Sequence, residues 1–318
     1  MADPASPILR LGTRGSLLAR TQSQLVADEL MRRHPDLRVE LITVRTTGDR
    51  ITDRPLHDVG GKGLFTKELE QALLADEVDF AVHSFKDVPV TMPLVETSNL
   101  VIAVVPKRED PRDAVVMRDP SKGPLPHRAR VGTSSLRRQA QLLELGNDFT
   151  VVPLRGNIDT RLRKVRDGEY DVIVLAMAGL LRAGLFDPSY MTPLDPAKGM
   201  LPAPAQGALA LQCRADDAQT RNLLAPLNDP TTAACVAAER GVVRGLNGDC
   251  HSPIAALATV DAPEGQMWLR AAVGARDGQP PVVRAEARGP AGDTPALVAH
   301  VVNLLLSRGA QPGAAGPD

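Results

Sequence analysis

Two similar stretches decide the fold: ILRLGTRGS at residues 8–16 and RVGTSS at residues 130–135. Each begins as a short apolar strand, passes through Gly and Thr, and reaches a serine ahead of a helix rich in leucine and glutamine. Serine is a favoured first residue of helices, and a strand that turns into a helix is the building unit of an α/β sheet. The repetition predicts two α/β lobes of similar construction.

Further short apolar runs extend both lobes. The additional strands are expected at residues 39–44, 80–83, 100–105, 114–117, 150–153, 171–175 and 207–213. The helices between them are expected at residues 65–74, 135–145 and 160–165. Because strands alternate with helices, both sheets should be largely parallel. The strand at residues 207–213 follows a proline-rich loop and could return to either lobe.

A third unit follows the second lobe. It combines an alanine-rich helix, a loop that contains Cys250, three strands and a last helix, at residues 231–246, 247–253, 254–260, 267–273, 282–287 and 295–306. This content predicts a small α+β domain. The Gly/Ala/Pro-rich tail from about residue 308 to 318 is expected to be disordered.

Composition excludes several functional classes. The 318 residues carry a formal net charge of −1, so no overall field attracts nucleic acid or a membrane surface. Aromatic residues make up 3% of the chain, so few rings are present on which the bases of single-stranded nucleic acid could stack. The sequence shows neither a signal peptide nor a membrane span, which predicts a cytoplasmic protein. Three cysteines without a Cys-x-x-Cys pair argue against a disulfide framework or a structural metal site.

Basic residues recur where strands end. They are Arg14, Arg137, Arg138, Arg155, Arg161 and Arg182. The carboxyl ends of strands face the ligand crevice in open α/β sheets, and helix starts there favour anions. Any one of these arginines is more often a solvated surface residue, and the serines are ordinary helix caps. Two cations in the first turn of a helix oppose its dipole, however, and should cost stability unless an anion visits. We therefore expect a site for carboxylates.

Three other segments carry chemical groups. Lys86 and Asp87 follow the end of a buried strand. They could form a surface ion pair, or Asp87 could be a carboxylate among cations that stabilises a developing positive charge. The glycine-rich stretch at residues 60–63 lacks the full spacing of a nucleotide-binding loop and fits a mobile flap better. Cys250 lies in a loop, which makes it a candidate nucleophile or attachment point.

Six motifs in the same order resemble the porphobilinogen deaminase family, also called hydroxymethylbilane synthases. They are VGGKGLF at 59–65, AVHSFKDVP at 81–89, VGTSSLRRQ at 131–139, LRGN at 154–157, PAQGA at 204–208 and GDC at 248–250. The resemblance covers nearly the whole chain. It implies two periplasmic-binding-like (type II) α/β lobes around a cleft, plus a small C-terminal α+β domain: lobe one at 1–106 and 206–227, lobe two at 107–205, and the third domain at 228–318.

The resemblance also implies a monomeric transferase of haem biosynthesis. Such an enzyme joins four porphobilinogen molecules head to tail, with loss of ammonia, on a dipyrromethane cofactor held by a thioether to Cys250. Asp87, Lys86 and Arg14 would be catalytic. Cofactor binding is implied for Asp87, Lys86, Ser16, Thr133, Ser134, Ser135, Arg137, Arg138, Arg155 and Gly156, and substrate binding for Arg14, Arg155, Arg161, Arg182, Gln206 and Phe65. His251 and Ser252 depart from the Gln-Val common in the family.

Two rival functions remain open on the residues alone. A non-enzymatic solute-binding protein would share the two-lobed architecture, but it would need export and gives no reason for a third domain with a loop cysteine. A nucleotide-dependent transferase using residues 60–63 would need a metal-holding Asp and Ser/Thr pair that the sequence lacks.

Overall fold

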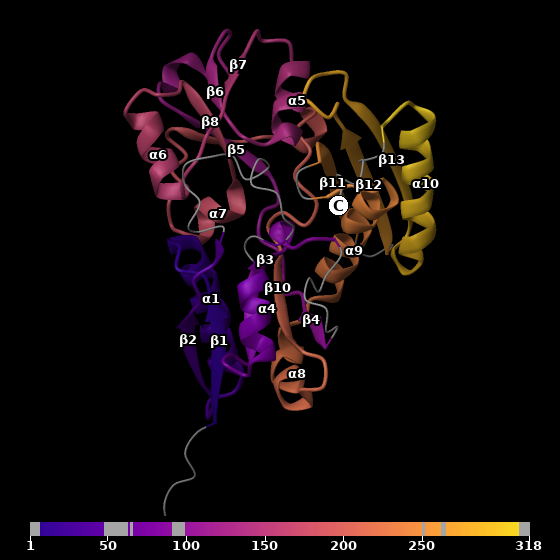
Figure 1. The fold of residues 1–318 in the computed structure, drawn as a ribbon. Coiled ribbons are helices and arrows are strands. Elements are labelled where there is room, and N and C mark those ends of the chain that lie inside the picture. Colours follow the sequence, from indigo (N-terminus) through magenta and orange to yellow (C-terminus); the bar gives the residue numbers. More distant parts are fainter. Residues whose placement is uncertain are drawn as a thin grey trace, which may run out of the picture. The chain divides into compact units, whose positions relative to one another are not determined.

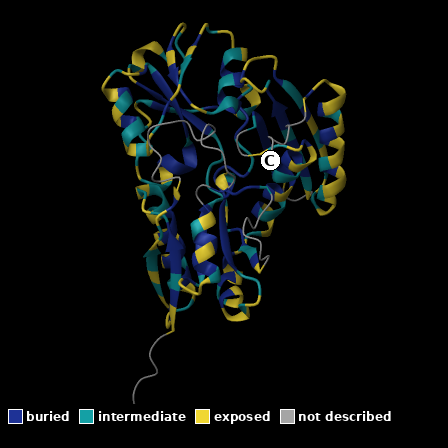
Figure 2. Ribbon diagram, in the orientation of Figure 1, coloured by how far each residue is buried: buried dark blue, intermediate teal, exposed yellow. Residues whose placement is uncertain are grey.

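The computed structural model describes residues 7–47, 63, 66–90, 99–249, 252–261 and 265–311 (Figure 1). The chain divides into two compact units. The first unit combines Met1–Arg108 with Ala208–Ala233, and the second combines Glu109–Gly207 with Ala234–Asp318. Each unit has its own hydrophobic interior, drawn in dark blue along the sheets in Figure 2.

The first unit is built on a five-stranded sheet in the order β2-β1-β3-β10-β4. Its strands are β1 (Ile8–Thr13), β2 (Arg38–Thr43), β3 (Phe80–Ser84), β4 (Leu100–Val104) and β10 (Leu209–Arg214). All run parallel except β10, which is antiparallel to both β3 and β4. The strand expected at residues 207–213 therefore returns to the first lobe.

Helices cover both faces of this sheet. They are α1 (Leu17–Arg33), α4 (Lys67–Leu74) and α8 (Ala218–Leu224), with the short helices η1 (Phe85–Asp87) and η4 (Ala225–Leu227). Successive strand residues point to opposite faces. Leu11 accordingly packs with Leu30 of α1, whereas Ala81 packs with Leu69 of α4 in a separate cluster. Burial on both faces explains why the inner strands β3 and β10 are buried at almost every position.

The second unit contains a sheet of the same design, in the order β7-β6-β8-β5-β9. Its strands are β5 (Asp113–Met117), β6 (Arg130–Gly132), β7 (Thr150–Val152), β8 (Val172–Ala176) and β9 (Met191–Pro193). Here β5 runs antiparallel to β8 and β9, while β6 is parallel to β7 and β8. Each sheet thus places one antiparallel strand in the fourth position, which confirms the prediction of two similar lobes.

The helices of this lobe begin just after the strands. They are α5 (Leu136–Glu144), α6 (Ile158–Arg166) and α7 (Met177–Arg182), with η2 (Pro120–Lys122) and η3 (Pro196–Lys198). Helix α6 begins two residues before the predicted start at residue 160, with Asn157 as its N-cap. Arg161 consequently belongs to the second turn of the helix rather than to its first.

A three-stranded antiparallel sheet completes the second unit, in the order β11-β12-β13. The strands of this sheet are β11 (Ile254–Asp261), β12 (Gln266–Val273) and β13 (Val283–Pro290), and the helices of this region are α9 (Pro230–Gly245), η5 (Ala291–Asp293) and α10 (Thr294–Ser307). The first four residues of α9 belong to the first unit. Helix α10 lies against β12 and β13 and buries Leu297, Val301 and Leu305. The predicted fold class, two α/β lobes with a small α+β domain, is confirmed.

The end of α10 differs from the sequence prediction. The backbone N–H groups of Arg308, Gly309 and Ala310 all bond to carbonyls of the last helical turn, and Ala310 is buried. Residues 308–310, which we assigned to a disordered tail, instead cap the helix. Residues 312–318 lie outside the described residues.

Candidate functional site

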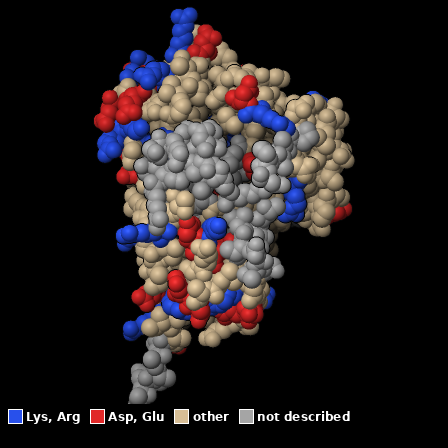
Figure 3. All heavy atoms as spheres, viewed as in Figure 1, with Lys and Arg blue, Asp and Glu red and all other residues tan. Residues whose placement is uncertain are grey.

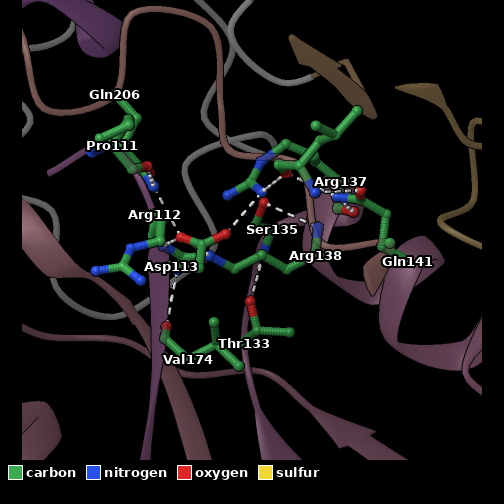
Figure 4. Close-up of polar contacts among 12 residues, drawn as sticks. Pro111, Arg112, Asp113, Thr133, Ser135, Arg137, Arg138, Gln141, Val174 and Gln206 are labelled. Carbon is green, nitrogen blue, oxygen red and sulfur yellow. Dashed lines mark hydrogen bonds and ion pairs between the residues drawn. The ribbon is translucent and has the colours of Figure 1, made fainter. Parts of the chain in front are cut away.

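A buried carboxylate, Asp113 at the start of β5, holds two of the candidate arginines (Figure 4). Its Oδ2 accepts a hydrogen bond from Nη1 of Arg137 at 2.8 Å. Its Oδ1 accepts from Nη2 and Nε of Arg138, at 2.7 and 3.2 Å, and from Nε2 of Gln206 at 2.9 Å. Asp113 and Gln206 are fully buried, and the two arginines are 5% and 7% exposed. We call these four residues the Asp113 cluster.

Backbone carbonyls fix the cluster from several sides. Arg137 also donates from Nη1 to the carbonyl of Leu201 at 2.7 Å, and Arg138 donates from Nη1 to the carbonyl of Val174 on β8 at 2.8 Å. Gln206 reaches the carbonyl of Pro111 at 2.8 Å. The arginines arrive here because α5 begins at residue 136, which turns its first two basic residues toward the neighbouring β5 and β8 strands.

The cluster carries one net positive charge. Burial would by itself raise the pKa of Asp113, but the charges of Arg137 and Arg138 outweigh it and hold that pKa well below its usual value. Burial lowers the pKa of Arg137, an effect that Asp113 opposes. With all three groups ionised, two guanidinium groups face one carboxylate. A buried excess charge is unfavourable unless it is paired, so the cluster favours one visiting anion.

This charge count corrects one step of the sequence argument. We expected that a visiting anion must offset both arginines at the start of α5. Asp113, which lies 24 residues before Arg137 in the chain, already offsets one of the two charges. An anion at this position would therefore have to offset one charge only.

The hydroxyl groups ahead of α5 shape the loop that leads into the helix. Ser135 caps α5 by accepting a hydrogen bond from the N–H of Arg138 at 3.4 Å, and Thr133 accepts one from the N–H of Ser135 at 3.1 Å. Ser134 is bonded at 3.0 Å to both the N–H and the carbonyl of Leu154, so it ties the ends of β6 and β7 together. Ser135 is thus the helix cap that the sequence predicted, whereas Thr133 and Ser134 hold the preceding loop. Contact of these three residues with a ligand stays a prediction.

The loop after β7 depends on Gly156. This residue has φ +108°, and a Cβ placed there would lie 2.7 Å from Cγ2 of Thr160. Its carbonyl accepts a hydrogen bond from Nε of Arg161 at 2.7 Å. The neighbouring Arg155 is half-buried. Glycine is required here because a side chain would meet both an unfavourable backbone conformation and a steric clash.

Arg182 ends α7 and bonds to the segment that contains Gln206. Its Nη2 donates to the carbonyl of Gly207 at 2.7 Å, and the N–H of Glu109 donates to the same carbonyl at 3.2 Å. Burial lowers the pKa of Arg182 to about 10, although the nearby Glu109 opposes the decrease. The guanidinium group remains charged at neutral pH.

The first unit carries the other set of candidates at one edge of its sheet. Arg14 follows β1, and Lys86 and Asp87 lie in η1, directly after β3. Since β1 and β3 are parallel neighbours, their carboxyl ends meet at the same edge. Ser16 caps α1 by accepting from the N–H of Ala19 at 3.4 Å. The Asp87 side chain is exposed.

A buried polar chain lies behind this edge. Nε2 of His83 on β3 bonds to Oε1 of Gln212 on β10 at 2.9 Å, and Nε2 of Gln212 donates to Oε1 of Glu70 on α4 at 2.9 Å. Gln212 therefore accepts from His83, so His83 carries its proton on Nε2. Burial lowers the pKa of His83 to about 4; the bond to Gln212 opposes this shift and the charge of Arg14 adds to it.

The candidates thus fall into two sets, one in each unit. Asp87, Lys86, Arg14 and Ser16 belong to the first unit, and the residues between 133 and 206 belong to the second. Phe65, Cys250, His251 and the glycine-rich residues 60–62 lie outside the described residues. Sequence reasoning missed Asp113. The signal that could have found it is a carboxylate directly before a strand of four apolar residues, where charge is rare unless it is paired.

The charged side chains on the surface do not mark a ligand site in the same way. On the face drawn in Figure 3, acidic and basic side chains are interspersed, in keeping with the net charge of −1. The charge that matters for an anion is the local, buried one of the Asp113 cluster.

Within the part of the chain that the structure describes, no helix is both long enough and apolar enough to span a bilayer.

Fold and site together define a two-lobed α/β protein whose second unit buries two arginines against one carboxylate. The chain belongs to the porphobilinogen deaminase family: residues 9–222 match the model described as "Porphobilinogen deaminase, dipyromethane cofactor binding domain", and residues 233–307 match that of the family's C-terminal domain. This membership assigns the protein to tetrapyrrole biosynthesis, among transferases that use porphobilinogen.

Solved structures with a distant likeness include regulatory proteins. YhfZ from Shigella flexneri is 18% identical, with 75% of this chain and 90% of that chain covered and a TM-score of 0.34. The reduced regulatory domain of OxyR from Pseudomonas aeruginosa is 15% identical (70% and 94% covered, TM-score 0.36). The sulfate-bound regulatory domain of a mutant OxyR2 from Vibrio vulnificus is 16% identical (71% and 99%, TM-score 0.41). Likenesses this low carry no functional argument.

Proposed function

We propose that this protein is a hydroxymethylbilane synthase. It joins four porphobilinogen molecules head to tail, with loss of one ammonia for each, and the addition of one water then releases the linear tetrapyrrole hydroxymethylbilane. The growing chain is held on a dipyrromethane cofactor that is linked to Cys250 through a thioether. The observation that carries the proposal is the match of both family domains over residues 9–222 and 233–307, together with a buried cationic cluster in the matched part of the second unit.

The residues of the second unit fit a ligand that carries carboxylates. Each pyrrole unit brings an acetate and a propionate, and the Asp113 cluster has one positive charge to be matched. Guanidinium groups bind carboxylates through paired hydrogen bonds. In this proposal the acidic side chains are held by Arg137, Arg138, Arg155, Arg161 and Arg182, assisted by Thr133, Ser134, Ser135, Gly156, Gln206 and Phe65. When bound, the dipyrromethane supplies the pyrrole end to which the first substrate unit is joined.

The residues of the first unit are suited to the chemical step. Loss of ammonia leaves positive charge on the substrate, and the carboxylate of Asp87 stabilises that charge. Lys86, Arg14 and Ser16, at the same edge of the sheet, bind the substrate's carboxylates and leave Asp87 as the group of opposite sign. The exposure of Asp87 supports the proposal, since its carboxylate is accessible.

Lobe one comprises residues 1–106 and 206–227, lobe two 107–205, and the third domain 228–318. The enzyme acts in the cytoplasm as a monomer.

Intact-mass measurement of the purified protein tests the proposal. We expect a mass above that of the bare sequence by one dipyrromethane, a positive reaction with a pyrrole-detecting aldehyde, and ammonia release from porphobilinogen. Cys250→Ser should lack the added mass, whereas Cys213→Ala should retain it, because Cys213 is buried and burial raises the pKa of its thiol to about 11. A protein of bare mass that binds porphobilinogen without releasing ammonia would contradict the proposal and favour a solute-binding function.

A further inference from the structure

A second buried carboxylate of the second unit, Glu239 on α9, belongs to neither set of candidate residues. It is fully buried, and each of its two oxygens accepts a hydrogen bond from the backbone. Oε2 accepts from the N–H of Ala205 at 2.6 Å, and Oε1 accepts from the N–H of Ala258 on β11 at 2.9 Å. The side chain therefore joins three parts of the second unit: the helix α9, the strand β11 and the segment that ends at Gly207.

Proline residues explain why a side chain is needed at this place. Strand β11 lies at the edge of its sheet, and the N–H of Ala256 donates there to the carbonyl of Pro202 at 3.2 Å. Regular strand pairing cannot continue along this edge, because Pro202 and the proline two residues later have no N–H to donate. The carboxylate of Glu239 supplies the acceptor for the next two N–H groups, those of Ala205 and Ala258.

Ala205 has a backbone conformation that is rare for a residue with a side chain. Its φ is +62°, in the left-handed region where a Cβ lies too close to the backbone. Such strain persists only when surrounding contacts hold the residue in place, and the bond to Glu239 is one of these contacts. The turn at Ala205 determines where the next two residues lie: Gln206 is fully buried, and the carbonyl of Gly207 is directed at Arg182.

The carbonyl of Gly207 orients Arg182. Nη2 of Arg182 donates to this carbonyl at 2.7 Å, and among the residues that the structure describes it is the one hydrogen bond of the guanidinium group. The position of Gly207 is closely defined, because its carbonyl also accepts from the N–H of Glu109 and a Cβ on Gly207 would clash with the carbonyl oxygen of Glu109. A shift of the turn at Ala205 would therefore remove the contact that orients Arg182.

We propose that Glu239 is a positioning residue for substrate binding: it holds Ala205 in the left-handed conformation and thereby directs the Gly207 carbonyl at Arg182. This inference rests on the proposed function, in which Arg182 binds carboxylates of the substrate. Glu239 acts through the backbone turn and not by contact with the ligand. A helix outside the two five-stranded sheets thus contributes to the geometry of a binding residue in lobe two.

Glu239→Met tests this role, because methionine keeps the length of the side chain but removes both acceptor oxygens. We expect KM for porphobilinogen to rise about tenfold, as for one lost hydrogen bond of a charged group, with kcat unchanged. The melting temperature should fall as well. Asp217→Asn is the control for stability alone. The carboxylate of Asp217 accepts from the N–H of Thr220 at 2.9 Å in the first unit, so its loss should lower the melting temperature and leave KM unchanged.

Ala205→Gly distinguishes positioning from a merely structural role. Glycine adopts a positive φ without steric cost, so the turn no longer depends on the bond to Glu239. In the double variant Glu239→Met with Ala205→Gly, we expect KM to return to within about twofold of the wild-type value. The melting temperature should stay below that of the wild type, because the N–H of Ala258 still lacks its acceptor.

The inference is overturned if Glu239→Met keeps the wild-type KM, or if its KM rises and Ala205→Gly does not restore it. Should Glu239→Met alone fail to fold, the double variant decides: it should fold with the KM of Ala205→Gly, and an unfolded double variant or one with a raised KM contradicts the role. A wild-type protein with no cofactor mass and no turnover would instead refute the proposed function. The rate at which phenylglyoxal modifies Arg182, followed by peptide mass, would still test the inference: it should be higher in Glu239→Met and return to the wild-type rate in the double variant.

Discussion

Gln206 donates a hydrogen bond from Nε2 to Oδ1 of Asp113 at 2.9 Å, although the two residues are 93 positions apart. It is the third donor to that oxygen, after Nε and Nη2 of Arg138, while Arg137 occupies Oδ2. Both oxygens of Asp113 are thus held from within the protein, Oδ1 by three donors and Oδ2 by one. A visiting anion would have to bind those arginine donors that Asp113 does not use.

Replacement of this donor tests its share of the cluster. Gln206→Leu keeps the volume but removes the bonds to Asp113 and to the Pro111 carbonyl, so we expect unfolding in denaturant to become easier by about 1 to 2 kcal/mol. Gln139→Leu is the matched control, because its amide donates at the surface, to the carbonyl of Asp277. Equal losses in the two variants would show that the buried bonds add no stability.

The sequence predicted the strands and helices well where the hydrophobic pattern was strong. Residues 8–33 and 130–145 contain apolar strands, capping serines and amphipathic helices, and each of these local signals agrees with the fold. The directions of β5 and β10 could not be predicted. When both faces of a sheet are buried, a strand is a continuous apolar run whether it pairs in a parallel or an antiparallel manner. Its direction therefore depends on long-range pairing, which the local sequence does not show.

The sequence predicted which residue types belong to the candidate site and at which strand ends they lie, but it did not predict their hydrogen-bond partners. Arg137 and Arg138 were identified from their position at a helix start, whereas Asp113 was placed just outside the strand predicted at residues 114–117. Its role depends on contacts 24 and 25 residues away that no local pattern encodes. The same holds for the bond between Arg182 and Gly207, which requires the tertiary fold.

Substitution of Asp87 tests the chemical step. Asp87→Asn keeps the shape but removes the negative charge, and we expect turnover to fall by about 100-fold or more. Because this side chain is exposed, the melting temperature should be unchanged. Asp36→Asn, at another exposed position of the first unit, is the control and should leave both quantities unaffected. Turnover near the wild-type rate in Asp87→Asn would remove this carboxylate from the mechanism.

His83 predicts a pH dependence of stability. Burial lowers its pKa to about 4 in the folded protein from 6.5, so the unfolded chain binds more protons between these values. The free energy of unfolding should therefore be constant with respect to this group above about pH 6.5 and fall by about 3 kcal/mol as the pH drops to 4. His83→Gln keeps a donor for Gln212 without a titrating ring. In denaturant titrations it should lose this part of the pH dependence; an unchanged profile would assign the dependence to other groups.

Gly156 links backbone geometry to the position of Arg155. Gly156→Ala would place a Cβ 2.7 Å from Cγ2 of Thr160 at φ +108°, and we expect a loss of about 2 to 3 kcal/mol together with a raised KM for porphobilinogen, because the adjoining arginine is displaced. Gly184→Ala is the matched control: its φ is +65°, but nothing lies within 4 Å of the added atom, so it should cost about 1 kcal/mol and leave KM unchanged. If both variants lose the same stability and keep the same KM, the contact with Thr160 has no influence on the site.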